Sequence, residues 1–190
     1  MTFDPAEHHR RTIRIPGYDY SLPGGYYVTI VIHGREHLLG KIVDGNMKLD
    51  RFGRIVHNTW FDLPGHYPHI ELDAFVIMPN HVHGIIFLNE NRRGGSLDEG
   101  DGGRNDPNWA SKSHAPQPQT RPYTPHPLSE IVRAFKSFSA RRINLLRRTT
   151  SQPVWQRNYY EHVIRDNTDY MSKRDYILNN PSNWDTDEEK

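Results

Sequence analysis

Two histidines separated by one residue, His81 and His83, stand in an apolar segment that follows the turn-forming pair Pro79-Asn80. Residues two positions apart on a strand point to the same face, so the two imidazoles would lie side by side. Adjacent neutral imidazoles can form half of a divalent metal site. The alternative is a pair of surface histidines, in a chain that contains 12 histidines. The spacing alone leaves both interpretations open.

A tyrosine and an asparagine four positions apart, Tyr176 and Asn180, precede Pro181. On a helix this spacing places both side chains on one face. A phenol is a weak nucleophile at neutral pH unless a metal or a base assists it, and an amide oxygen is a hard ligand that suits a magnesium-like or manganese-like ion. The alternative is that Tyr176 is a core aromatic residue and that Asn180 ends the helix before the proline.

The segment 154–166 mixes aromatic, basic and acidic side chains. Arg157 and Arg165 beside stacking aromatic rings would suit the phosphates and unpaired bases of a single strand. Equally, Trp155 and Tyr160 could be core residues, with Arg165 paired to a neighbouring carboxylate. Both interpretations remain open on the pattern alone.

Basic residues concentrate in the segment 129–150, although the net charge of the chain is only +1 with neutral histidines. Against the single acidic residue Glu130, this segment carries Arg133, Lys136, Arg141, Arg142, Arg147 and Arg148. A local basic stripe on a nearly neutral protein indicates a polyanion at one face, and a solvated helix face is the alternative.

The hydrophobic periodicity predicts the elements that must position these residues. Strands are expected at 25–32, 70–78, 81–88 and 155–164, with a small hairpin over 38–49. Helices are expected at 50–66, 128–148 and 166–180, the first with Asp50 as its N-cap and the last stopped by Pro181.

The order strand-helix-strand, twice over, is that of a ferredoxin-like split β-α-β sandwich. The sequence therefore predicts an α+β protein with a four- to five-stranded antiparallel sheet and helices on one face, plus a C-terminal helix. Many functions use this architecture, so the fold class alone does not decide the activity.

The length of 190 residues favours one compact domain, which we expect over 17–184. Residues 1–16 would form an N-terminal arm and residues 185–190 an acidic tail. The stretch 89–126 is rich in glycine, proline and small polar residues and has almost no aliphatic ones, so it predicts a flexible insertion.

The composition excludes several classes of protein. The chain contains no cysteine, which excludes disulfides and thiolate metal sites and suits a reducing compartment. The first residues show no secretory signal, and no run of about 18 apolar residues could cross a membrane. We therefore expect a cytoplasmic protein without a membrane partner.

Three segments, in this order, resemble the single-tyrosine HUH transposases, and above all the REP-associated tyrosine transposases. The segment 78–87 resembles the His-hydrophobic-His strand of that family. The segment 155–165 resembles its Trp-Gln…Glu-His-x-Ile-Arg block, and 176–181 with the following Trp184 resembles its tyrosine helix. The resemblance extends over about residues 17–184.

The resemblance implies the HUH endonuclease fold and an enzyme that cleaves and rejoins DNA through a 5′-phosphotyrosine intermediate with Mg²⁺ or Mn²⁺. It implies Tyr176 as the nucleophile. It also implies His81 and His83 as metal ligands, with Asn180 as the third.

The implied partner is single-stranded or hairpin DNA at the nucleoid, and the resemblance leaves open whether the protein is a monomer or a homodimer. Glu161 and His162 would support the site. Side chains expected to contact DNA are Arg133, Lys136, Arg141, Arg142, Arg157 and Arg165.

Two other functions compete with this one. A ferredoxin-like nucleic-acid-binding module without catalysis would bind the same polymer. A metal-dependent hydrolase without a covalent intermediate would use His81 and His83 with a carboxylate such as Glu161 or Asp73, and it would not need Tyr176.

Overall fold

The computed structural model describes Ile15 and residues 17–89 and 126–186 of the chain. Nearly all of the N-terminal arm and of the polar insertion predicted from the sequence, and most of the acidic tail, lie outside these residues. Among the described residues, no helix combines the length and the apolar character that crossing a bilayer requires.

The described chain alternates strands and helices in the order expected from the sequence. In chain order the elements are β1 (Gly24–Val31), the 3₁₀ turn η1 (His33–Arg35), β2 (Gly40–Val43), β3 (Asn46–Leu49), α1 (Arg51–Phe61), α2 (Leu63–His66), β4 (Ile70–Ile77), β5 (His81–Leu88), α3 (Leu128–Arg147), β6 (Tyr160–Ile164), α4 (Asn167–Asn179) and the 3₁₀ segment η3 (Asn180–Thr186).

Four of the strands form one sheet in the order β4-β5-β1-β6, and every neighbouring pair is antiparallel. This order is the ferredoxin-like one, in which the first strand lies between the third and the fourth. The strands β2 and β3 form a separate two-stranded ribbon, as the hairpin signal predicts. The expected α+β fold with a four-stranded antiparallel sheet is therefore confirmed.

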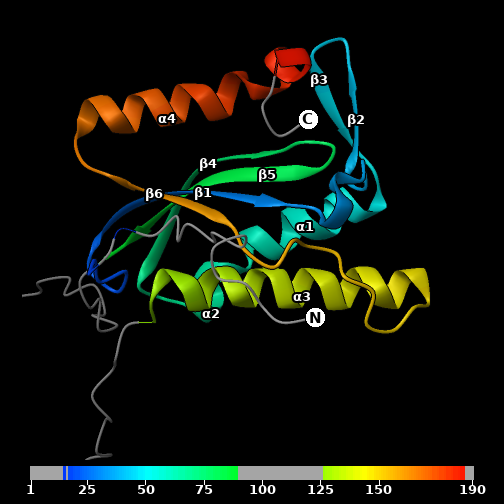
Figure 1. The fold of residues 1–190 in the computed structure, drawn as a ribbon, viewed down its shortest axis with the longest axis horizontal. Helices are drawn as coiled ribbons and strands as arrows, with labels where there is room; N and C mark the ends of the chain where they lie inside the picture. The colour runs from blue at the N-terminus through cyan, green and yellow to red at the C-terminus, as the bar shows by residue number, and fades with distance from the viewer. Residues whose placement is uncertain (1–14, 16, 90–125, 187–190) are drawn as a thin grey trace, which may run out of the picture.

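The two faces of the sheet are covered by different helices, and not by helices on one face alone (Figure 1). On β1, Tyr26, Val28 and Ile30 belong to the main core that α1 and α3 cover. Tyr27 points the other way, into a smaller apolar cluster with Ile177 of α4. Because strand residues alternate between faces, the parity of a position decides which helix layer its side chain meets.

The first helix begins as predicted and ends earlier than predicted. The Asp50 carboxylate accepts hydrogen bonds from the backbone N–H groups of Phe52 and Gly53 at 2.8 and 2.9 Å, which confirms it as the N-cap. The helix predicted over 50–66 is instead divided into α1 and α2. Pro64, in the first turn of α2, lacks an N–H and so cannot continue the ladder of α1.

The fourth strand of the sheet is shorter than predicted. The sequence predicts that it begins at Trp155, whereas β6 begins at Tyr160. The ammonium group of Lys136, on α3, donates hydrogen bonds to the carbonyl oxygens of Gln156 and Arg157 at 2.6 and 2.9 Å. Carbonyl groups turned toward this charge are not available to the strand ladder, so regular pairing starts only beyond them.

The last α-helix ends where proline predicts, but the helical path continues. The α-helix α4 stops at Asn179, and η3 carries the chain through Pro181 to Thr186 as a 3₁₀ helix. Short 3₁₀ stretches are common at the ends of α-helices. This extension brings Trp184 to the ring of His81, with centroids 6.1 Å apart.

A glycine in β5 is required by the packing of the main core. A Cβ atom at Gly84 would lie 2.5 Å from Cζ2 of Trp60, whose buried indole stacks on Phe75 with ring centroids 4.4 Å apart. We expect Gly84→Ala to lower the free energy of unfolding by about 1–3 kcal/mol, because the core must shift to admit the methyl group. Urea denaturation measures this change.

The matched control for this prediction is Gly65→Ala in α2, where a Cβ atom would meet nothing within 4 Å. Its unfolding free energy should stay the same or rise slightly. Equal destabilisation by the two substitutions would contradict the steric explanation.

Candidate active site

The histidine pair lies on the α4 face of β5, and both side chains are buried, with 0% and 1% exposure for His81 and His83. Their ring centroids are 4.5 Å apart. The predicted strand and the shared face are confirmed, and the alternative of two surface histidines is wrong. Two adjacent imidazoles in the interior need a shared chemical role or specific partners.

Each imidazole is held through its Nδ1 atom. His81 Nδ1 lies 2.7 Å from Oδ1 of Asn80. An amide oxygen only accepts, so this Nδ1 carries the proton and Nε2 keeps its lone pair. His83 Nδ1 lies 2.7 Å from the hydroxyl of Tyr27 and 2.8 Å from that of Thr29. Within the described part of the chain, the buried Nε2 of His83 has no hydrogen-bond partner.

The surroundings of His83 keep its imidazole neutral. Burial lowers the pKa of His83 well below its ordinary value, and the nearby His81 lowers it further. A neutral imidazole is the form that binds a metal ion. His83 is therefore in the protonation state that a metal site requires.

Tyr176 of α4 lies against the histidines. Its ring centroid is 5.2 Å from that of His83, at an interplanar angle of 70°. The side chain is 43% exposed, so the alternative that it is a core residue is wrong. The same chain provides both the imidazoles and the phenol, and no second copy is needed to bring them together.

Asn180 has both features that its sequence position suggested. It is the C-cap residue of α4, where its backbone N–H donates to the carbonyl oxygen of Ile177. Its side chain is 2% exposed, and among the residues that the structure describes its Oδ1 accepts no hydrogen bond. An unsatisfied buried carbonyl oxygen is an open acceptor, and a cation satisfies such a group.

The available donor atoms suit a divalent cation held by nitrogen and amide oxygen. They do not suit a hydrolase whose metal is held by a carboxylate. The Nε2 of His83 and the Oδ1 of Asn180, which lack hydrogen-bond partners among the described residues, are atoms of the kinds that divalent cations accept as ligands. Over residues 17–89 and 126–186, no group of three or more histidines and carboxylates could hold a metal ion. The carboxylate of Asp73 accepts a hydrogen bond of 2.5 Å from Tyr170 and lies 3.7 Å from Arg174.

The two residues expected to support the site, Glu161 and His162, lie on opposite faces of the sheet. Glu161 pairs in register with Val28, so its buried carboxylate lies on the side of the main core. His162 lies on the α4 face, and its Nε2 donates to Asp169 at 2.8 Å. This hydrogen bond holds the pKa of Asp169 below its ordinary value. It also ties β6 to the first turn of the helix that carries Tyr176.

The aromatic residues around β6 have two different roles. Trp155 is buried in the main core, and its indole N–H donates to Ser139 Oγ at 2.9 Å. Tyr160 is 40% exposed and meets the edge of Tyr27 at a centroid distance of 6.3 Å. The core interpretation is therefore confirmed for Trp155, while Tyr160 remains open to solvent beside Tyr27.

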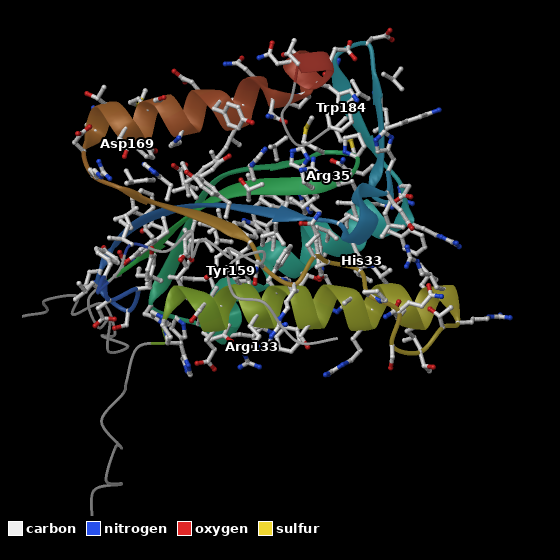
Figure 2. All side chains as sticks on the ribbon, in the orientation of Figure 1. His33, Arg35, Arg133, Tyr159, Asp169 and Trp184 are labelled. Atoms are coloured by element: carbon white, nitrogen blue, oxygen red, sulfur yellow. The ribbon has the colours of Figure 1, made fainter. Side chains whose placement is uncertain are left out.

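The basic helix α3 lies on the opposite side of the sheet from the histidines, and Figure 2 shows Arg133 beyond α3, far from Asp169 and Trp184. Arg142 donates to Thr59 and Asp62 at 3.1 Å, which ties α3 to α1. Lys136 binds backbone carbonyls, as described above. Of the expected DNA-contacting set, only Lys136 is partly buried, and the exposed members are Arg133, Arg141, Arg142, Arg157 and Arg165.

The contacts of Lys136 indicate a structural role, which experiment can distinguish from a role in binding DNA. Burial lowers the pKa of Lys136, and its ammonium group satisfies the carbonyls of Gln156 and Arg157. We expect Lys136→Met to lower the unfolding free energy by about 1.5–3 kcal/mol, the usual range for hydrogen bonds to a charged group. Urea denaturation checks this value.

Arg133→Met, one helical turn earlier, is the matched control. Its ion pair with Glu130 is long, at 3.5 Å, and solvent-exposed, so stability should change by no more than about 0.5 kcal/mol. If Lys136→Met left stability unchanged and weakened DNA binding instead, the structural role would be refuted.

Sequence reasoning missed the residues that hold the imidazoles. Tyr27 and Thr29 contact His83, and Asn80 contacts His81. Lys173 lies over the ring of Tyr27, with its Nζ 5.4 Å from the centroid. Only the adjacency of Asn80 to the histidines was a usable signal, because strand register is needed to bring Tyr27 and Thr29 to His83.

The fold and this arrangement of residues define a class of protein. No protein-family model matches the chain. A solved structure of a REP-associated tyrosine transposase bound to a REP hairpin superimposes with a TM-score of 0.54, at 20% sequence identity, over 88% of this chain and 72% of that one. The chain thus has the fold of the REP-associated tyrosine transposases.

Two proteins with similar sequences show the family to which the chain belongs. An uncharacterized protein of Haemophilus influenzae is 38% identical over 188 residues, which cover 98% of this chain and 96% of that protein. The chain belongs to the same family as this protein. A second Haemophilus influenzae protein, named as a candidate REP-associated tyrosine transposase, is 26% identical over 86% of this chain and 73% of its own length. The resemblance stated from the three motifs is confirmed.

Proposed function

We propose that this protein is a metal-dependent DNA transposase that cleaves and rejoins single-stranded DNA with Tyr176 as its nucleophile. One observation carries the proposal: the phenol ring of Tyr176 and the imidazole ring of His83, 93 positions apart in the sequence, meet with centroids 5.2 Å apart. The transposase fold supports it. The exposure of the phenol supports it further, since a nucleophile must reach its substrate.

We propose His81, His83 and Asn180 as the protein ligands of Mg²⁺ or Mn²⁺. The open lone pair of His83 Nε2 and the unsatisfied Oδ1 of Asn180 support this set. All three ligands are neutral, so the site itself does not cancel the charge of the ion and leaves it to attract a phosphate. When bound, the ion would polarise the scissile phosphate and stabilise the charge that develops in the transition state.

In the proposed cleavage step, the Tyr176 oxygen attacks phosphorus in line with the 3′ oxygen. The new tyrosine oxygen–phosphorus bond forms as the bond from phosphorus to the 3′ oxygen breaks. The phenol loses its proton and the 3′ oxygen gains one. The products are a 5′-phosphotyrosine linkage and a free 3′-hydroxyl.

Rejoining is the reverse reaction with a second DNA end. A 3′-hydroxyl attacks the phosphotyrosine, restores the phosphodiester and releases the Tyr176 phenol. The number of phosphoester bonds is conserved, so strand transfer needs no nucleotide triphosphate. The sequence has no glycine-rich phosphate-binding loop, which agrees with a reaction that uses no nucleotide triphosphate.

The proposed substrate is single-stranded or hairpin DNA, in line with the REP hairpin bound by the structural relative. The strand to be cut would lie on the α4 face, where Tyr176 is exposed. Arg157 and Arg165, which are exposed and lie just before and just after β6 in the sequence, are proposed phosphate contacts. Arg133 and Arg141 on α3 would reach DNA on the other side of the sheet.

The test uses the full chain, Mn²⁺ and a pool of DNA hairpins with randomised single-stranded flanks. With a label at the 3′ end of the DNA, the proposed chemistry leaves labelled DNA covalently attached to the protein after denaturation. With a label at the 5′ end, it releases a labelled fragment that ends in a 3′-hydroxyl. Cleavage without any covalent adduct would favour the hydrolase, and binding without cleavage would favour the inactive nucleic-acid-binding module.

A further inference from the structure

We propose that Tyr27 and Thr29 are positioning residues for His83. Their hydroxyl oxygens share the hydrogen bond that His83 donates from Nδ1–H, so the lone pair of Nε2 points into the site. This inference rests on the proposed function for the identity of the ligand, a divalent cation. It assigns a role to two side chains of β1 that have none in the chemistry described above.

The geometry of the three residues is defined by the register of the sheet. Thr29 pairs directly with His83 across the antiparallel ladder of β1 and β5, and Tyr27 lies two positions away on the same face. Their hydroxyl oxygens lie 2.8 and 2.7 Å from the same ring nitrogen. All three side chains are buried. Two hydroxyls therefore converge on one nitrogen, away from competing water.

The direction of the remaining hydrogen bond decides which nitrogen carries the proton. The hydroxyl of Thr29 donates its own proton to the hydroxyl oxygen of Tyr27, at 3.2 Å. The Thr29 oxygen consequently turns its lone pairs toward His83, and it can only accept from Nδ1. A neutral imidazole has one N–H, so a proton on Nδ1 leaves Nε2 as a bare acceptor.

The opposite tautomer is disfavoured by burial. With the proton on Nε2, His83 would have a buried N–H donor without an acceptor among the described residues. An unsatisfied buried donor is costly, whereas an unfilled lone pair is the feature that a cation can use. His81 also carries its proton on Nδ1, because this nitrogen donates a hydrogen bond to Oδ1 of Asn80.

Tyr27 also contacts the proposed nucleophile. Its ring meets the edge of the Tyr176 ring at a centroid distance of 6.3 Å. One side chain thus touches both a proposed metal ligand, through its hydroxyl, and the attacking phenol, through its ring. The hydroxyl can be removed without the ring, which allows the two contacts to be separated by experiment.

The experiment compares the full-length wild type with Tyr27→Phe, Thr29→Val and the double variant. In the metal-free protein, ¹⁵N NMR of the histidine rings should find the proton of His83 on Nδ1, and the double variant should shift it toward Nε2. In a Mn²⁺ titration followed by calorimetry, the double variant should bind about 10–100-fold more weakly, the usual effect of losing such a supporting partner. Each single variant should lose less, because the other hydroxyl still accepts.

Two controls separate positioning from packing. Tyr170→Phe removes a tyrosine hydroxyl from α4 that bonds to Asp73 rather than to a histidine, so it should leave Mn²⁺ affinity and the tautomer of His83 unchanged. Thr29→Ser keeps the hydroxyl and should behave as the wild type. A loss of affinity in Thr29→Ser equal to that in Thr29→Val would assign the effect to packing and overturn the proposal.

The two readouts also separate this proposal from the proposed function. A His83 proton on Nε2 in the wild type, or a double variant with unchanged tautomer and affinity, would overturn the positioning role. A wild type that carries the proton on Nδ1 but binds no Mn²⁺ would instead refute the metal-dependent function, while the assignment of the tautomer to Tyr27 and Thr29 would stand on the NMR of the variants.

Discussion

Replacing Tyr176 by phenylalanine should abolish the covalent protein–DNA adduct and lower the cleavage rate by about 10⁴-fold or more, since the variant has no oxygen to attack phosphorus. The affinity for single-stranded DNA should remain, because the ring and its contact with His83 are retained. The phenol is 43% exposed, so stability should change by no more than about 0.5 kcal/mol. Denaturing gel electrophoresis with 3′-labelled DNA measures the adduct, and fluorescence anisotropy measures the binding.

Tyr160→Phe is the matched control for this variant. Tyr160 is another exposed tyrosine on the same face of the sheet, and its ring also meets Tyr27 at a centroid distance of 6.3 Å. The control should form the adduct as the wild type does. An adduct that persists in Tyr176→Phe and disappears in Tyr160→Phe would move the nucleophile from α4 to β6.

Replacing both His81 and His83 by alanine should remove DNA cleavage together with the binding of Mn²⁺. The loss of affinity should exceed the about 10–100-fold that follows from changes to supporting residues, because the ligands themselves are gone. In the wild type, a chelator should stop cleavage and added Mn²⁺ should restore it. In the double variant, Mn²⁺ should restore nothing.

The two histidines are buried, so their removal carries a structural cost that must be measured beside the activity. We expect a loss of about 1–3 kcal/mol in unfolding free energy, which urea denaturation would detect while the fold persists. His57→Ala, at an exposed position on α1, controls for the loss of a histidine elsewhere and should keep both Mn²⁺ binding and cleavage. Cleavage by the wild type in excess chelator would refute the metal requirement.

Much of the local structure could be read from the residues themselves. The apolar segment that follows the turn-forming pair Pro79-Asn80 predicts β5 with its first residue at His81, and the carboxylate of Asp50 predicts the start of α1. The i, i+2 rule places His81 and His83 on one face, as observed. These features depend on backbone geometry over a few neighbouring residues, so they need no knowledge of the rest of the chain.

Local patterns were insufficient in two places: the start of the strand predicted at Trp155, and the role of the basic stripe on α3. Residues 156 and 157 have strand-like neighbours, but a lysine 20 positions earlier takes their carbonyl groups. The basic residues of α3 do share a helix, yet several of them make contacts within the protein. Lys136 and Arg142 use their charges in contacts within the chain that no helical pattern reveals.

The sequence by itself determined the kinds of side chain available, the faces they take within each strand or helix, and the resemblance to a transposase family. Only the tertiary structure decided that His83 is buried beside the phenol of Tyr176, that Tyr27 and Thr29 hold its Nδ1, and that α3 lies across the sheet from this cluster. The reason is physical. Periodicity follows from bonds between neighbours, whereas strand order, register and the choice of face follow from the burial of apolar surface by segments far apart in the chain.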